Sequence, residues 1–177
     1  INMPLIISGM AYGLALSEPA KIALARGARL AGTAVNSGEG PFLTKERKEA
    51  GKYILQISRW PWGLRTDEQI SSADMLEVQV SQGAHCGCYY VTAEEIKGKA
   101  RRLMNISRKQ GIANWAAPGF IKSVQDWPRL VESLRKRANG VPIGVKIMAT
   151  DMLEEDLAIA VQAGFDVIAI DGAQGGA

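Results

Sequence analysis

Short apolar segments alternate with amphipathic segments along the whole chain. Seven of the apolar segments are rich in valine and isoleucine, are bounded by Gly, Asp or Asn, and show little alternation of apolar and polar residues. This pattern is typical of parallel strands that are covered on both faces of a sheet. The predicted strands are residues 4–8, 31–35, 53–58, 76–81, 112–116, 142–147 and 166–171.

Segments between these strands carry the signals of helices. Ser17 is placed as an N-cap ahead of a proline in the first turn, and Gly27 is the expected stop of that helix. Thr92 is followed three positions later by Glu95, which is the spacing of a capping box. The predicted helices are residues 17–30, 92–104, 123–140 and 151–164.

The order of these elements predicts about seven β-α units and therefore a parallel sheet, either doubly wound or closed into a barrel. No Gly-x-Gly-x-x-Gly sequence follows the first strand, which counts against a dinucleotide-binding domain. Polar or glycine residues instead follow most strands, as in a TIM barrel, where sites are built at the carboxyl ends of the strands. They are Ser8-Gly9-Met10, residues 36–40, Gln82-Gly83, Lys146 and Asp171-Gly172. We therefore expect an α/β fold of the TIM (β/α)8 class, incomplete because an eighth strand is missing, with residues 1–177 as one domain of a longer chain.

Composition and charge narrow the class of protein further. The 177 residues are 47% hydrophobic and 22% charged, which excludes a disordered chain or a coiled coil. The net charge is +3, and the densest basic patches, at 101–109 and 135–137, fit solvated helix faces better than a nucleic-acid site. No apolar run reaches the ~18 residues of a membrane span, and no signal peptide opens the chain, so we expect a cytoplasmic protein without a membrane span.

The two cysteines, Cys86 and Cys88, are too few for a disulfide scaffold. With His85 they do not complete a zinc or iron–sulfur site, because such sites take four ligands. We interpret them as loop thiols and expect no metal site in this chain.

Two strand ends offer candidate chemistry for an anionic ligand. The segment 170–176, Ile-Asp-Gly-Ala-Gln-Gly-Gly, exposes backbone N–H groups that suit a phosphate, although a glycine-rich turn has the same composition. Lys146 lies in an otherwise apolar strand, where a buried charge must be paired. It would neutralise an anion or the pyrimidine side of a reduced flavin, or it would snorkel at the strand end.

Other strand ends offer polar groups whose role the residue types alone leave open. Residues 36–40, Asn-Ser-Gly-Glu-Gly, supply a carboxamide, a hydroxyl and a carboxylate, but the same residues favour turns. The Gln82 amide would bind a flavin ring or a keto acid, or cap a strand. Trp60 and Trp62 either line a pocket wall or pack in the core, whereas Trp127 is expected to pack.

Five motifs in order resemble the FMN-binding domain of the glutamate synthase family, from Pro4 to Gly176. Residues 4–40, PLIISGMAYGLALSEPAKIALARGARLAGTAVNSGEG, resemble the family's I-S-G-M-S-F-G-A-L-S-like start, its Gly-Thr pair and its Asn-[Ser/Thr]-Gly-Glu-Gly loop. Further along, LEVQVSQGA resembles its Gln-Gly-Ala strand, VPIGVKI its lysine strand and AGFDVIAIDGAQGG its phosphate loop.

The resemblance implies an FMN barrel that reduces 2-iminoglutarate, formed from 2-oxoglutarate and ammonia, to glutamate. It implies catalytic roles for Lys146, Gln82 and Glu39, and places Ser37 and Glu39 toward the keto acid or the ammonia entry. The implied FMN contacts are Ser8, Gly9, Met10, Asn36, Gln82 and Lys146, with the phosphate against Gly172, Ala173, Gly175 and Gly176. The implied partners are an electron-donor protein or domain and a glutaminase subunit in an oligomer. The family's iron–sulfur cysteines would lie beyond this chain.

Several loops depart from the family pattern and leave alternatives open. Pro41 replaces a usual glycine, SRWPWG and GAHCGCYY differ from the corresponding loops, and ANWAAPGF lacks the Arg and His of many members. A related FMN enzyme that forms N-methylglutamate from methylamine, or a non-catalytic cofactor-bearing subunit of a larger complex, therefore stays open.

Overall fold

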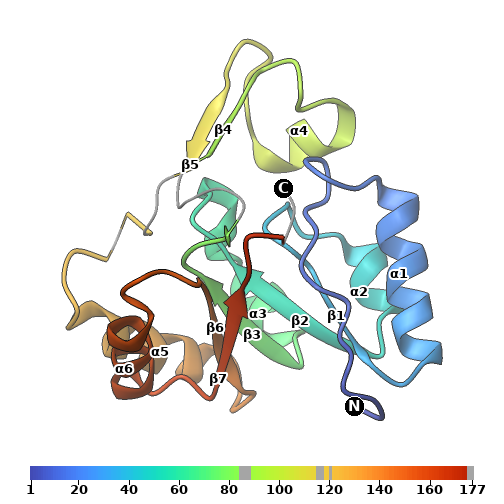
Figure 1. The fold of residues 1–177 in the computed structure, drawn as a ribbon. Coiled ribbons are helices and arrows are strands. Elements are labelled where there is room, and N and C mark those ends of the chain that lie inside the picture. The colour runs from blue at the N-terminus through green and yellow to red at the C-terminus, as the bar shows by residue number, and fades with distance from the viewer. Residues whose placement is uncertain (84–88, 115–117, 120, 175–177) are drawn as a thin grey trace.

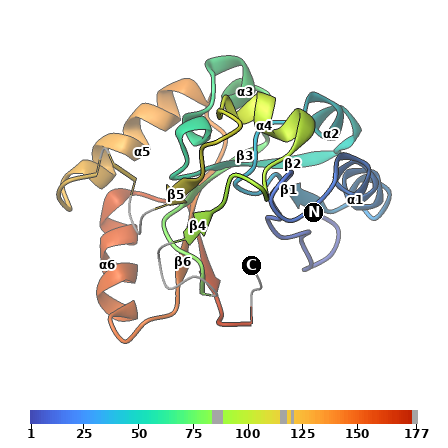
Figure 2. The same ribbon diagram turned by 90° about the horizontal axis from the view of Figure 1, so that it is seen from above.

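The central element of the computed structural model, which describes residues 1–83, 89–114, 118–119 and 121–174, is a curled, five-stranded parallel sheet (Figures 1 and 2). Its strand order is β1-β2-β3-β6-β7, so that neighbouring strands are joined by crossovers on one face. The strands are β1 (Ala34–Asn36), β2 (Lys52–Ile57), β3 (Met75–Gln79), β6 (Ile143–Met148) and β7 (Val167–Asp171). The sheet forms half of a barrel, which confirms the predicted α/β barrel class.

Helices cover the outer, convex face of this sheet (Figure 2). Apolar side chains of alternate strand residues, such as Leu55, Val78 and Ile143, are buried there in one core with the helices. The covering helices are α1 (Glu18–Leu30), α2 (Thr44–Glu49), α3 (Asp67–Ser71), α5 (Asp126–Arg137) and α6 (Leu153–Ala163). Because successive strand side chains point to opposite faces, the remaining residues of each strand face the inside of the half-barrel.

Local signals explain where several helices begin and end. The Ser17 hydroxyl accepts a hydrogen bond from Ala20 N at the start of α1, as predicted, and Gly164 ends α6 with φ +84°. Gly27, however, does not stop α1, which continues to Leu30. A glycine inside a helix weakens it by about 1 kcal/mol but leaves its hydrogen bonds intact, so the helix ends only where Gly32 takes φ +67°.

The helix predicted from Thr92 begins six residues later, as α4 (Gly98–Met104). The hydrogen bond of the predicted capping box forms, since Thr92 N donates to Glu95 Oε2 at 2.6 Å, but it closes a turn. The chain then extends through Lys97 at φ −127° so that Ile96 enters a core beneath it.

Two predicted barrel strands are not part of the parallel sheet. Residues 4–8 contribute only a single parallel bridge, between Ile7 and Val35. The strand at 112–116 is β5 (Ile112–Asn114), which pairs antiparallel with β4 (Tyr89–Val91), a strand that the sequence pattern did not predict. Three-residue strands of this kind depend on their partner more than on their own residues.

The unit β4–α4–β5 lies at the carboxyl ends of the parallel strands (Figure 1). Its side chains share a small core with Tyr12 and Trp60, which belong to the loops that follow the first bridge and β2. A short 3-10 helix, η1 (Pro61–Leu64), follows Trp60. None of the helices that the structure describes is long and apolar enough to cross a membrane.

Candidate functional site

The inner face of the half-barrel becomes polar toward the carboxyl ends of its strands. The register of β2 with β3 pairs Gln56 with Glu77, and the register of β3 with β6 pairs Gln79 with Lys146. The side chains of each pair therefore lie side by side on the same face of the sheet. All four are buried. A polar group buried without a partner is unfavourable, so the contacts of these side chains indicate what the face is built to hold.

One group of contacts centres on Glu77. Its Oε1 accepts hydrogen bonds from Asn36 Nδ2 at 2.7 Å and from Gln56 Nε2 at 2.8 Å. Gly9 lies against this group, because a Cβ at that position would be 3.0 Å from Asn36 Oδ1 and 3.1 Å from Gln56 Nε2. The structure thus brings Gly9 and Asn36 together, with Met10 next to Gly9 in the same loop.

A second group of contacts centres on Asp171. Lys146 Nζ lies 2.8 Å from Asp171 Oδ1, and Gly83 N donates to Asp171 Oδ2 at 2.9 Å. The predicted pairing of the buried lysine is therefore confirmed, and the snorkelling alternative is wrong. Gln82, just before Gly83, accepts a hydrogen bond from Gln79 Nε2 at 2.9 Å.

The two groups meet on β3, where Glu77 and Gln79 point to the same face. The side-chain oxygens Oε1 of Gln56 and Gln79 are buried, and within the described part of the chain neither has a hydrogen-bond partner. Two unpartnered amide oxygens beside a buried ammonium suit a planar heterocycle that offers both N–H donors and carbonyl acceptors. The isoalloxazine ring of FMN has such an edge, so the residues present fit this cofactor.

The Asn36–Gly40 loop lies at one side of this face and is buried throughout. The Ser37 hydroxyl accepts from Gln56 N at 2.9 Å and donates to Gly38 O at 3.0 Å. Gly38 has φ +67°, and a Cβ there would lie 2.6 Å from the carbonyl carbon of Met10. The loop is therefore packed backbone to backbone against the segment that contains Gly9 and Met10.

Two stacked indoles hold Glu39. Trp60 Nε1 donates to Glu39 Oε2, and Trp62 Nε1 donates to the Glu39 carbonyl, each at 2.7 Å. The two rings are stacked with centroids 5.2 Å apart. Trp60 is 1% exposed, so it is a core residue that orients Glu39. Trp127 packs against Phe165, as expected.

Some predicted site residues lie at the edge of the described chain or outside it. Ser8 is exposed, as are Gly172 and Ala173 after β7. Gly175, Gly176, His85, Cys86 and Cys88 fall outside the described residues. Within the described residues, no cluster of His, Cys, Asp or Glu could hold a metal ion.

Sequence reasoning missed three inward-facing residues, Gln56, Glu77 and Gln79. The predicted strands as a group alternate little, but the segment Leu-Glu-Val-Gln-Val-Ser at 76–81 alternates strictly, and this period of two would have placed Glu77 and Gln79 on the inner face. It also missed two buried cations beneath the Asn36–Gly40 loop, Lys21 and Arg65. No local pattern marks these, because their partners are distant in the sequence.

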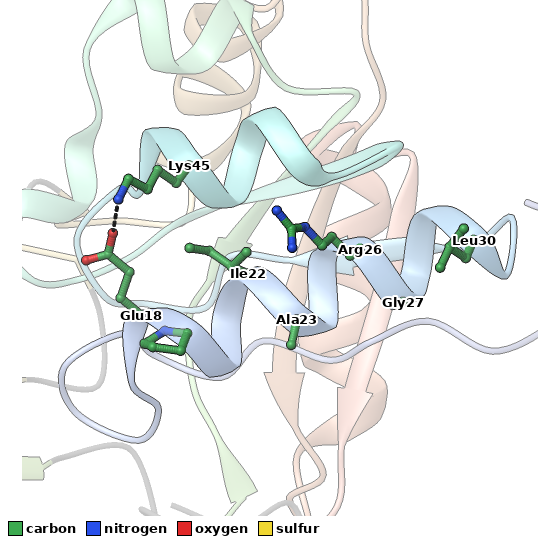
Figure 3. Close-up of a pocket in the computed structure, with 8 residues that line it drawn as sticks. Glu18, Ile22, Ala23, Arg26, Gly27, Leu30 and Lys45 are labelled. Carbon is green, nitrogen blue, oxygen red and sulfur yellow. Dashed lines mark ion pairs between the residues drawn. The ribbon is translucent and has the colours of Figure 1, made fainter.

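A different hollow lies on the outer layer, between α1 and α2. This groove of about 720 Å³ is lined by side chains that include Ile22, Arg26, Leu30 and Lys45, with Lys45 paired to Glu18 (Figure 3). None of the inward-facing polar residues is part of its wall. We therefore place the candidate site at the strand ends and not in this groove.

Known proteins resemble the chain over nearly all of its length. The family model described as the conserved region in glutamate synthase matches residues 1–177. A glutamate synthase large subunit-like protein of Rhizobium meliloti is 30% identical over 99% of the chain and 40% of its own length. An archaeal glutamate synthase [NADPH] of Archaeoglobus fulgidus is 31% identical over 99% of the chain and 34% of its own length.

A solved structure, a mandelate oxidase mutant with a monooxide FMN adduct, has a similar fold. Its TM-score is 0.55 at 20% identity, and it covers 94% of this chain and 46% of its own. The chain thus spans less than half the length of each of these proteins.

Proposed function

The chain belongs to the glutamate synthase family, and from that premise we propose that it supplies the FMN-binding half-barrel of an oxidoreductase that reduces 2-iminoglutarate to glutamate. The imine would form from 2-oxoglutarate and ammonia. The observation that carries the proposal is the buried Lys146–Asp171 pair, 2.8 Å apart, beside the amides of Gln79 and Gln82 on the inner face. The relatives named as glutamate synthases and the FMN-containing structural neighbour support it.

The inner face would hold the flavin ring through its amides and its ammonium. Lys146 would stand beside the electron-rich pyrimidine edge, where a positive charge favours the reduced cofactor. Gln79 Oε1 and Gln56 Oε1, which lack partners in the described structure, are the acceptors available to a ring N–H. Gly9 keeps the neighbouring space free of a side chain. Bound FMN would supply the hydride chemistry.

The remaining predicted residues would bind the cofactor phosphate and the substrate. Gly172 and Ala173 begin the glycine-rich turn after β7, and exposed backbone N–H groups in such a turn suit a phosphate. Gly175 and Gly176 would complete this turn. Asn36 would contact the flavin, with Ser8 and Met10 at the rim. Ser37 and Glu39 would face the keto acid or the entering ammonia.

Glu39, Gln82 and Lys146 would carry the catalytic roles. Glu39 is 8% exposed and held by Trp60, which keeps a negative charge fixed where an ammonium ion would enter. Lys146 would stabilise negative charge on the flavin or the carboxylate, and Gln82 would orient the keto acid or the ring. Positioning of this kind contributes to catalysis by holding reacting groups in alignment.

Electrons would come from a partner protein or domain. The relative from Archaeoglobus fulgidus is named for NADPH, which would be the source of these electrons through an iron–sulfur protein, a flavoprotein or a further domain. An iron–sulfur cluster would have its ligands outside this chain, and ammonia would come from a glutaminase subunit within an oligomer or from solution. The cytoplasm is the compartment that suits these substrates.

The test is the visible absorption spectrum of the complete natural protein. We expect a flavin band that dithionite bleaches and that returns when 2-oxoglutarate and ammonium are added together, but with neither alone. Replacing ammonium by methylammonium tests the alternative product, N-methylglutamate. K146M should weaken FMN binding, whereas K136M, at a lysine 73% exposed on α5, should leave it unchanged. Absence of a flavin band after incubation with FMN would overturn the proposal.

A further inference from the structure

Two buried cations lie beneath the Asn36–Gly40 loop. Lys21, on α1, is 1% exposed, and its Nζ donates to Asn36 O at 3.2 Å and to Ser37 O at 3.0 Å. The same ammonium lies 2.8 Å from Glu46 Oε1 on α2. An ion pair between two helices of the outer layer thus binds the backbone at the end of β1.

The second cation is Arg65, which follows η1. Its Nε donates to Gln56 O at 2.9 Å, and its Nη2 donates to Gly38 O at 3.3 Å and to Gly40 O at 2.9 Å. The planar guanidinium therefore links β2 to two carbonyls of the loop. Arg137 on α5 donates in turn to Arg65 O at 3.1 Å.

Every carbonyl of residues 36–40 accepts a hydrogen bond from a side chain outside the loop. Lys21 and Arg65 account for four of the five, and Trp62 holds the Glu39 carbonyl. The loop has almost no freedom to move unless these donors move with it. Its other side is fixed as well, because a Cβ on Gly40 would lie 2.5 Å from Tyr12 O.

This arrangement is unfavourable in itself. Burial lowers the pKa of Lys21 and raises the pKa of Glu46, although their mutual attraction opposes both shifts. Burial also lowers the pKa of Arg65 to about 10. Arg65 has φ +53° and ψ +147°, a region that residues other than glycine rarely adopt. Apolar side chains would avoid the burial of charge, but they would leave the loop carbonyls without donors and would not fix their direction.

We propose that Lys21 and Arg65 are positioning residues for the reaction, which set the placement of Asn36, Ser37 and Glu39 relative to the inner face of the half-barrel. The inference rests on the proposed function, because the groups positioned are those that would meet the flavin, the keto acid and ammonia. Neither cation needs to contact substrate for this role. A small shift of the loop would misalign its side chains with the reacting groups and lower the rate.

The chain offers a matched control in Arg101. This arginine is also buried, and its guanidinium also donates to three carbonyls, those of Ala93, Ile96 and Ser107. It belongs to the β4–α4–β5 unit, and all three of these hydrogen bonds stay within that unit. R65K and R101K therefore each replace a buried guanidinium that donates to several carbonyls by an ammonium, and only R65K removes donors to the Asn36–Gly40 loop.

The experiment compares wild type, R65K, R101K and K21R in the complete protein with its electron donor. Flavin content, melting temperature, and kcat and KM for ammonium and 2-oxoglutarate are measured between pH 6 and pH 10. We expect R65K to lose at least tenfold in kcat/KM, and R101K less than threefold, at a similar melting temperature. A buried lysine loses its proton more readily than arginine, so the alkaline limb of the R65K profile should move to lower pH.

Hydrogen exchange of the peptide that covers residues 36–40 gives a readout that is independent of turnover. The exchange should be faster in R65K and in K21R than in wild type, and unchanged in R101K. K21R provides the same test if R65K does not fold. If wild type is active and R65K and R101K show the same kcat/KM and the same hydrogen exchange at residues 36–40, the positioning proposal is overturned while the proposed function stands. If wild type takes up no FMN and forms no glutamate, the proposed function fails, and this inference fails with it.

Discussion

Lys146 Nζ and Asp171 Oδ1 lie 2.8 Å apart across the register of β6 and β7. The two side chains are only 8% and 12% exposed, and the second carboxylate oxygen of Asp171 accepts from Gly83 N. Asp171 thus neutralises the ammonium and ties the loop after β3 to the turn after β7. The pair connects three candidate segments: the Gln82 loop, the lysine strand and the glycine-rich turn.

Removing one partner of this pair should be worse than removing both. D171N keeps the shape of the side chain but leaves the buried ammonium without a counter-charge, so the free energy of unfolding should fall by about 3 kcal/mol. The double variant K146M/D171N should regain at least a third of that loss, because no charge is left buried. Urea unfolding of the flavin-free proteins measures both. Equal losses in the single and double variants would contradict a coupled pair.

The indole contacts of Glu39 should differ in strength. W60F removes a hydrogen bond to a carboxylate and should lower the free energy of unfolding by about 2 kcal/mol, whereas W62F removes one to a neutral carbonyl and should cost about 1 kcal/mol. Phenylalanine keeps most of the ring contact at both positions. Under the proposed function W60F should also raise KM for ammonium, because Glu39 is no longer held. A larger loss in W62F than in W60F would contradict this assignment.

The carboxylate of Asp166 should contribute stability that is lost at acidic pH. Its Oδ2 accepts from Ile143 N at 2.8 Å, and this bond, with the ion pair to Arg135, lowers the pKa of the carboxyl group. A lowered pKa in the folded state stabilises the protein above the ordinary aspartate pKa, and that gain is lost as the pH falls through the folded value. The difference in melting temperature between wild type and D166N should therefore be full at pH 6 and shrink below about pH 4.

Sequence patterns were sufficient for five of the seven predicted parallel strands. The buried valine and isoleucine segments became β1, β2, β3, β6 and β7, shifted by one to three residues at their starts or ends. The pairing of Lys146 followed from elementary electrostatics, since a buried ammonium needs a partner. Its partner Asp171 was visible only as the acid of an Asp-Gly turn.

Contacts between distant segments could not be predicted in the same way. Lys21 looks like a solvated lysine on a helix, and only the fold brings Glu46 and the Asn36–Gly40 loop to its ammonium. The antiparallel pairing of β5 with β4 was missed for a related reason. β4 has three residues, too few for a period to be recognised, and each strand depends on the other for its backbone hydrogen bonds.

Two glycines should respond in opposite ways to alanine. Gly38 has φ +67°, and its Cβ would lie 2.6 Å from Met10 C and 2.8 Å from Ala11 N, so the loop or its neighbour must move. Backbone atoms cannot move aside as a flexible side chain can, and G38A should lower the free energy of unfolding by more than about 2 kcal/mol. Gly27 lies in the middle of α1, where a Cβ would meet nothing within 4 Å apart from its chain neighbours and the backbone of its own helix, and G27A should stabilise the protein by about 0.5–1 kcal/mol. Chemical unfolding of both variants measures this contrast. A G38A protein as stable as wild type would show that the two loops are not in backbone contact, and the placement of Asn36 beside Gly9 would then be wrong.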